Sequence, residues 1–211
     1  MDNSYVSPVL NIQQLIDDWM ENNTNNSFIM KMCIIWNLWK MRNDMVFSQD
    51  TRSHQWSPPH IPCVKINVDA AFIPNNGAAG AIARDHNGVF LGCGTCNFDS
   101  TSSLLVESLA CKLGLELGKR LGLEEFIIEG DATNVTSAVL GEVSQIPWSI
   151  RSTILEVRNM ASSFINVSFV SFPKNANNVA HVLCQHAMHE NVNMWWNADS
   201  PPLCILSNLY S

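Results

Sequence analysis

Charged side chains are scarce in this sequence of 211 residues, at 15% of the chain, and basic ones are outnumbered by acidic ones. Twelve Lys and Arg residues face 19 Asp and Glu residues, which gives a formal net charge of −7. Proteins that grip nucleic acid tightly usually carry a dense basic stripe, because cations displace the counterions of the phosphates. Here only Lys112, Lys119 and Arg120 cluster, which argues against strong duplex binding by this chain alone.

The sequence also shows no long apolar run and no recognisable signal peptide. The most apolar window, 28–41, is interrupted by Lys31 and Lys40 and is too short to span a bilayer. Met1 and Asp2 do not form the basic start of a signal peptide. Seven cysteines, an odd number, favour reduced thiols over a disulfide framework. We therefore expect an intracellular protein of the nucleus or cytoplasm, neither secreted nor bound to a membrane.

The sequence divides into three parts by composition, and its 46% hydrophobic content is enough for a real core. Residues 1–62 are expected to be a helical N-terminal extension that ends in a proline-containing linker. Residues 63–190 are expected to be a mixed α/β domain, and residues 191–211 an irregular tail. Trp19, Trp36 and Trp39 are helically spaced. We expect them to pack on the domain or on a helix of a protein partner, rather than to stack on bases.

Hydrophobic periodicity gives the order of elements in the α/β domain. Apolar residues alternate with polar ones over Val64–Asp69, which predicts a strand with one buried face that presents Asp69 on the other. Two further strands, 77–84 and 89–97, are joined by a hairpin turn rich in Asp, Asn and Gly. The pattern then predicts a helix at 102–121, a strand at 126–129, helices near 131–140 and 150–162, a strand at 166–172 and a helix at 177–189.

Four of these segments each carry one side chain that can ligate a metal: Asp69, Glu107, Asp131 and His181. Taken singly, each is an ordinary surface or helix-end residue. Asp131 follows a hydrophobic strand, at the end where α/β folds usually place ligand groups. Glu107 lies at the edge of an apolar helical stripe, so its carboxylate can reach the sheet, and His181 lies outside one, so it can face a cleft. Because Mg²⁺ is held by a few carboxylate oxygens and by waters, convergence of these side chains would suffice for a site.

The order of strand acid, helix acid, strand-end acid and late-helix ligand resembles the type 1 ribonuclease H domain over residues 63–190. The tryptophan-rich segment 35–44 is similar to one that precedes the nuclease domain in plant non-LTR retroelement proteins, the reverse transcriptase-like branch. The resemblance implies a ribonuclease H-like α/β fold. Its five-stranded mixed sheet would have three antiparallel strands followed by two parallel ones, with flanking helices.

The same resemblance implies a hydrolase, an endonuclease that cuts the RNA strand of RNA–DNA hybrids with two Mg²⁺ or Mn²⁺ ions. Asp69 would bridge both ions. Glu107 and Asp131 would each serve one ion or orient its waters, and His181 would take the fourth position. Residues implied to contact the substrate are Asn67, Ala70, Lys112, Lys174 and Asn178.

Departures from the family pattern support a second hypothesis. His181 stands where Asp is usual, Lys174 where Arg is common, and Ala70 where Gly is frequent. Neutral imidazole is a poorer partner for Mg²⁺ than a carboxylate. The alternative is therefore a catalytically weak or inactive domain that serves as a nucleic-acid-binding or protein-interaction module. The sequence leaves the natural substrate and the oligomeric state open.

Two other hypotheses are disfavoured by spacing. A 3′–5′ exonuclease of the wider superfamily usually has an acid two residues after the first strand's Asp, and position 71 is Ala. Cys93 and Cys96 are spaced like half of a zinc site. Residues three apart on a strand point to opposite faces, and no second pair has ligand spacing, so we do not expect zinc there.

Overall fold

The computed structural model describes residues 56–100, 102–173 and 177–209. The predicted helices and tryptophans of residues 1–55 lie outside this part of the chain. The described strands are β1 (Val64–Ile73), β2 (Asn76–Arg84), β3 (Phe90–Phe98), β4 (Glu125–Gly130), β5 (Asn166–Ser171) and β6 (Trp195–Asn197). The helices are α3 (Ser103–Arg120), α4 (Thr133–Leu140), α5 (Arg151–Ala161) and α6 (Asn178–Glu190), with short 3₁₀ turns between some of them.

The strands form one mixed sheet in the order β5-β4-β1-β2-β3-β6. β1, β2 and β3 pair antiparallel, while β4 and β5 run parallel to β1. This arrangement confirms the predicted three antiparallel and two parallel strands. The predicted count of five strands is wrong, because β6 pairs with the free edge of β3.

The sixth strand comes from the segment 191–211, which the sequence had indicated as irregular. It is only three residues long, too short for alternation to be visible. Trp195 packs against the larger hydrophobic core, and Trp196 packs against the smaller one on the other face of the sheet. Two neighbouring bulky apolar residues therefore pack on opposite faces of the sheet. The segment lacks the alternation of apolar and polar residues by which a strand is usually predicted.

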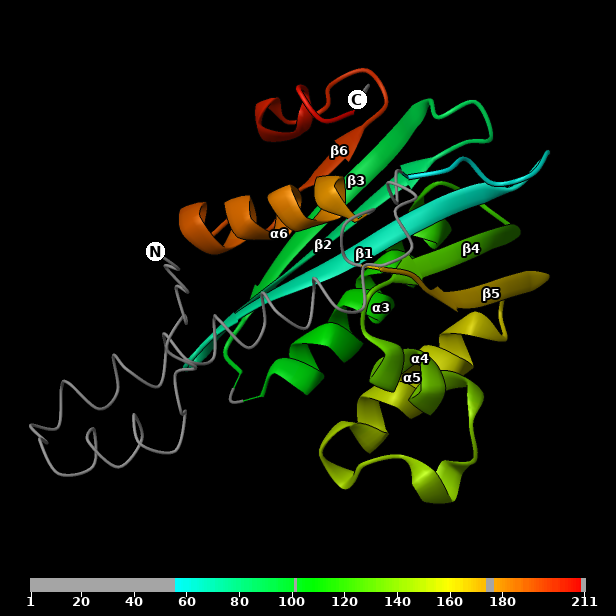
Figure 1. Ribbon diagram of the computed structural model, residues 1–211, viewed down its shortest axis with the longest axis vertical. Helices are drawn as coiled ribbons and strands as arrows, with labels where there is room; N and C mark the ends of the chain where they lie inside the picture. Colours follow the sequence, from blue (N-terminus) through cyan, green and yellow to red (C-terminus); the bar gives the residue numbers. More distant parts are fainter. Residues whose placement is uncertain (1–55, 101, 174–176, 210–211) are drawn as a thin grey trace, which may run out of the picture. The chain divides into compact units, whose positions relative to one another are not determined.

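Helices cover the two faces of the sheet unequally (Figure 1). α3, α4 and α5 pack on one face over a large core, and α6 packs on the other face over a smaller one. On β1, Ile66 and Val68 point into the large core, and Asp69, the residue after Val68, lies on the face of α6. The alternation of β1 thus delivers a buried carboxylate to the α6 face. None of the described helices is long and apolar enough to cross a membrane.

Candidate metal centre

Asp69 lies in the middle of β1 and is only 3% exposed. Its neighbour across the β1–β2 ladder is Gly80. An ionised carboxylate is costly to bury unless donors or cations compensate it, so the surroundings of Asp69 define what this site can hold.

Three carboxylates converge at this point. Asp69 of β1, Glu107 of α3 and Asp131, just after β4, each place an oxygen within 4.8 Å of the other two. Glu107 and Asp131 are half-buried. The three segments are far apart in sequence, and the fold brings them together because β4 lies directly beside β1 and α3 packs against β1.

This set of donors fits a hard divalent cation such as Mg²⁺ or Mn²⁺. Such ions take oxygen ligands and keep several waters, so a site of a few acids with an open side is suitable. Asp131 lines an open groove together with Thr133, Ser171, Phe172 and Pro173, which gives ions and waters access. The described residues thus offer the ligands and the opening that a hard-cation site needs.

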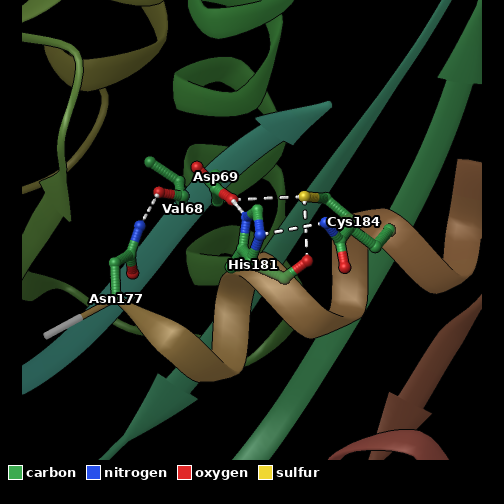
Figure 2. Close-up of polar contacts among 6 residues, drawn as sticks. Val68, Asp69, Asn177, His181 and Cys184 are labelled. Atoms are coloured by element: carbon green, nitrogen blue, oxygen red, sulfur yellow. Dashed lines mark hydrogen bonds and ion pairs between the residues drawn. The ribbon is translucent and has the colours of Figure 1, made fainter. Parts of the chain in front are cut away.

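His181, on α6, points toward the carboxylate of Asp69 (Figure 2). Its Nδ1 lies 2.8 Å from Asp69 Oδ2 and must donate, because a carboxylate oxygen only accepts. The single thiol proton of Cys184 is shared between two acceptors at 3.2 Å, the same Asp69 oxygen and the carbonyl oxygen of His181. Gln185 Nε2 lies 3.0 Å from His181 Nε2 and holds the far side of the ring. Asp69 therefore has two donors from α6, and Cys184 is one that the sequence did not reveal.

The first turn of α6 is anchored to β1 beside the site. Asn177 is 4% exposed and donates its side-chain amide to the carbonyl oxygen of Val68 at 2.7 Å. Figure 2 shows this bond next to the contact between Asp69 and His181. Asn177 directly precedes the helix, and its sequence spacing did not predict a hydrogen bond to β1, which lies 109 residues earlier in the chain.

The residues expected to contact substrate are spread out. Ala70 is half-buried and lines a groove with His181, and Asn178 is exposed at the start of α6. Lys112 pairs with Glu156 of α5, Nζ to Oε1 at 2.6 Å. Lys174 lies outside the described residues. These placements leave the substrate contacts as predictions.

Asn67, also expected to contact substrate, is 1% exposed and belongs to a buried polar network. Its amide nitrogen donates to Glu129 Oε1 at 2.9 Å, and its oxygen accepts from Arg84 at 3.0 Å and from the indole of Trp56 at 2.8 Å. The guanidinium of Arg84 lies 3.6 Å from the centre of the Trp56 ring. Lys65 forms an ion pair with Glu129 at 2.9 Å. The placement gives Asn67 a structural role beneath the linker.

Burial changes the acid–base properties of two groups near these clusters. It lowers the pKa of Arg84 to about 10, against the opposing attraction of Glu129. It raises the pKa of Cys111 to about 12, with a further contribution from Glu107 one helical turn earlier. Cys111 therefore stays a neutral thiol at physiological pH, and the carboxylate of Glu107 remains the ligand group on this turn.

A sequence family described as reverse transcriptase-like matches residues 67–187, more than half of the chain. The match begins in β1 and ends in α6, so it includes all four predicted ligand residues. No curated protein matches the chain.

Solved structures of ribonucleases H share the fold. RNase H1 from the halophilic archaeon Halobacterium salinarum NRC-1 is 20% identical, with a TM-score of 0.56, over 60% of this chain and 98% of that one. The N-terminal RNase H domain of rv2228c from Mycobacterium tuberculosis is also 20% identical, with a TM-score of 0.55, over 59% and 98% of the two chains. LC11-RNase H1 in complex with an RNA/DNA hybrid is 17% identical, with a TM-score of 0.56, over 61% and 98%. At these identities the likeness shows a ribonuclease H-like fold.

Proposed function

We propose that this chain, which belongs to the reverse transcriptase-like family, is a metal-dependent endonuclease that hydrolyses the RNA strand of RNA–DNA hybrids. The observation that carries the proposal is the convergence of Asp69, Glu107 and Asp131, with carboxylate oxygens within 4.8 Å of one another. A relative in fold, LC11-RNase H1, is described in complex with such a hybrid.

Each side chain has a part that its place in the fold supports. Asp69, buried between β1 and α6, would be the shared ligand of two Mg²⁺ or Mn²⁺ ions. Glu107 and Asp131, half-buried, would complete one ion's coordination each or orient its waters. When bound, the ions would supply an activated water and neutralise the charge on the leaving 3′-oxygen. His181 would hold the Asp69 carboxylate in a fixed orientation through its hydrogen bond.

Recognition of the hybrid would depend on shape. A hybrid duplex is distinguished by its groove form and its 2′-hydroxyls, which a protein can contact without reading bases. The low number of basic residues agrees with a substrate held by few phosphate contacts. We extend the proposal to descent from a plant retroelement on the basis of the tryptophan-rich segment 35–44 and the family description.

Gel analysis of a labelled hybrid with Mg²⁺ or Mn²⁺ tests the proposal. Wild type is expected to cleave only the RNA strand, and Asp69→Asn to lose at least about a hundredfold in rate, because a metal ligand contributes several kcal/mol. Asp99→Asn, at an exposed acid, is the matched control and should cleave like wild type. Equal cleavage by wild type and Asp69→Asn would show a contaminating nuclease and remove the proposal.

A specific contact favours the alternative of a weak or inactive binding module. Asp69 Oδ2 already accepts hydrogen bonds from His181 and Cys184, so a metal must compete with two donors for it. The alternative predicts no thermal stabilisation by millimolar Mn²⁺. A clear rise in the melting temperature with Mn²⁺ that Asp131→Asn abolishes would count against it.

A further inference from the structure

A second cluster of ligand-type atoms lies on the α6 side of Asp69. Asp69, His181 and Cys184 each offer one atom, and the three atoms lie within 4.8 Å of one another. Two of the separations are short: 2.8 Å from His181 Nδ1 to Asp69 Oδ2, and 3.2 Å from Cys184 Sγ to the same oxygen. Figure 2 shows both α6 side chains directed at this carboxylate.

The chemistry of this cluster differs from that of the three carboxylates. One thiol, one imidazole and one carboxylate are the donors that Zn²⁺ takes in proteins, whereas Mg²⁺ avoids sulfur. With zinc bonds of about 2.3 Å to sulfur and 2.0–2.2 Å to nitrogen and oxygen, neighbouring ligands of a tetrahedral site stand roughly 3.3–3.6 Å apart. The observed separations to Asp69 Oδ2 are a few tenths of an ångström smaller. Small side-chain movements would therefore admit the ion.

The spacing of the two side chains on α6 supports this arrangement. His181 and Cys184 are three residues apart on α6, so they share one face of the helix. Gln185 Nε2 lies 3.0 Å from His181 Nε2, so metal binding at Nδ1 requires the Gln185 amide to rotate and present its carbonyl oxygen, which would then accept a proton held on Nε2. His181 and Gln185 also line an open groove beside Ala70–Ile73, which gives an ion a way in. Cys184 itself is fully buried, so metal would be reached from the His181 side.

We propose that Asp69, His181 and Cys184 form a site for one Zn²⁺ ion, with water as the fourth ligand. On binding, the thiol of Cys184 gives its proton to solvent, and its sulfur takes the ion as a thiolate. The proton on His181 Nδ1 moves through solvent to Nε2, which frees Nδ1 as a neutral nitrogen ligand. The hydrogen bonds that now end on Asp69 Oδ2 are replaced by coordination to zinc.

The site has a consequence for activity, which rests on the function proposed above. Asp69 belongs to both clusters, so zinc on the α6 side draws on the carboxylate that the hard-cation site needs. Zn²⁺ is therefore expected to inhibit hybrid cleavage activated by Mg²⁺, and removal of the thiol at position 184 is expected to relieve this inhibition.

Cobalt(II) is the probe for the site, because it replaces zinc and gives a sulfur-to-metal charge-transfer band when a thiolate binds it. The full-length chain, reduced and freed of metal, is titrated with Co²⁺ and then with Zn²⁺. We expect a band that saturates at one equivalent of Co²⁺ and disappears as Zn²⁺ displaces the cobalt. Cys184→Ser should remove the band, because the hydroxyl that replaces the thiol gives no such transition.

Matched variants decide which thiol is responsible. Cys63 Sγ lies 3.5 Å from His60 Nε2, so it belongs to another Cys–His pair, and Cys63→Ser should keep the band. Should Cys184→Ser fail to fold, His181→Ala at a partly exposed position provides the test, with at least a tenfold loss of Co²⁺ affinity expected. A band that survives in Cys184→Ser, an unchanged Co²⁺ affinity in His181→Ala, or loss of the band in Cys63→Ser would overturn the proposal, as would the absence of any band in wild type.

One further variant separates this inference from the proposed nuclease. Glu107 lies outside the sulfur-containing cluster, so Glu107→Gln should keep the cobalt band while it loses stabilisation by Mn²⁺. Cys184→Ser should show the reverse. A protein that gives the band but does not cleave the hybrid would refute the nuclease proposal and support the zinc site. A protein that cleaves the hybrid but gives no band would refute the zinc site and support the nuclease proposal.

Discussion

The surroundings of Asp69 explain why a histidine can stand at position 181. Asp69 is 3% exposed, and an ionised carboxylate at such a position needs donors or a cation. His181 and Cys184 supply two donors without any ion. A carboxylate at position 181 would instead place a second negative charge against Asp69, which is unfavourable until a cation binds. His181 thus stabilises the metal-free protein, at a cost in affinity for hard cations.

Replacing His181 with Asp should reverse this balance. The metal-free variant is expected to lose about 1 kcal/mol, or about 2–4 °C in melting temperature, from like-charge repulsion. Its Mg²⁺ concentration for half-maximal stabilisation should fall about tenfold, because a carboxylate replaces an imidazole toward a hard ion. Thermal melts across a Mg²⁺ titration measure both effects.

The control for that substitution is His86→Asp, which adds the same charge in the β2–β3 turn, outside the cluster of Asp69, Glu107 and Asp131. It should leave the Mg²⁺ dependence unchanged. If His181→Asp binds Mg²⁺ no better than wild type does, position 181 is not a ligand position, and the fourth site of the sequence prediction is lost.

What the sequence could reveal at single residues depended on the pattern to which they belong. Asp69, Glu107 and Asp131 were singled out by their order along the chain, which resembles that of ribonuclease H, because each acid taken singly is an ordinary polar residue. Cys184 was not, because a fully buried cysteine on the apolar side of a helix looks like ordinary core. The contact between Cys184 and Asp69 arises from the packing of α6 on β1, which the sequence does not show. Asn177 was not predicted for the same reason, because its bond is also to β1.

Among the elements, the approach of α6 to the sheet decides where His181 and Cys184 stand. The residue opposite Asp69 on β2 is Gly80. A Cβ at that position would lie 2.9 Å from the backbone nitrogen of Cys184 and 3.0 Å from the carbonyl oxygen of Ala180. Both contacts are with helix backbone, which cannot move aside without moving the helix. The missing side chain of Gly80 is thus what lets α6 lie close enough to reach Asp69.

Gly80→Ala should lift α6 from the sheet. Overpacking of this kind costs about 1–3 kcal/mol, which chemical denaturation would measure as a loss of unfolding free energy. The larger effect is expected at the site, where the His181 and Cys184 contacts to Asp69 would lengthen and the Co²⁺ band would weaken. Gly92→Ala, where a Cβ would lie 3.1 Å from the carbonyl oxygen of Trp196 on the far side of β3, is the control. If both variants are equally destabilised and both keep the band, the close approach of α6 is not required.

Element prediction succeeded where length and alternation were sufficient. β1 was recognisable because Ile66 and Val68 alternate with polar residues, and α3 because its apolar stripe spans several turns. β6 was not, since its three residues owe their strand conformation to pairing with β3. That pairing is a tertiary contact between segments about one hundred residues apart, which no local pattern encodes.

For the whole molecule, charge sets how a nucleic acid could be held. The three clustered cations all come from α3, and two of them already have intramolecular contacts. Lys112 pairs with Glu156 at 2.6 Å, and the guanidinium of Arg120 lies 4.4 Å from the centre of the Trp195 ring. The order of elements sufficed to predict the fold, but the strength of substrate binding depends on such pairings, which the sequence alone did not give.

The affinity of the chain for a hybrid should therefore depend only moderately on salt. If at most two or three cations neutralise phosphates, raising salt from 50 to 200 mM should weaken binding by about 10- to 40-fold, against 10³–10⁵ for proteins with six to ten phosphate contacts. Fluorescence anisotropy with a labelled hybrid, Ca²⁺ replacing Mg²⁺ to suppress cleavage, measures this dependence. Lys119→Ala should reduce the slope of log affinity against log salt by about one if Lys119 contacts a phosphate. A thousandfold loss in wild type would mean that at least six phosphates are gripped, so that cations beyond the α3 cluster hold the substrate.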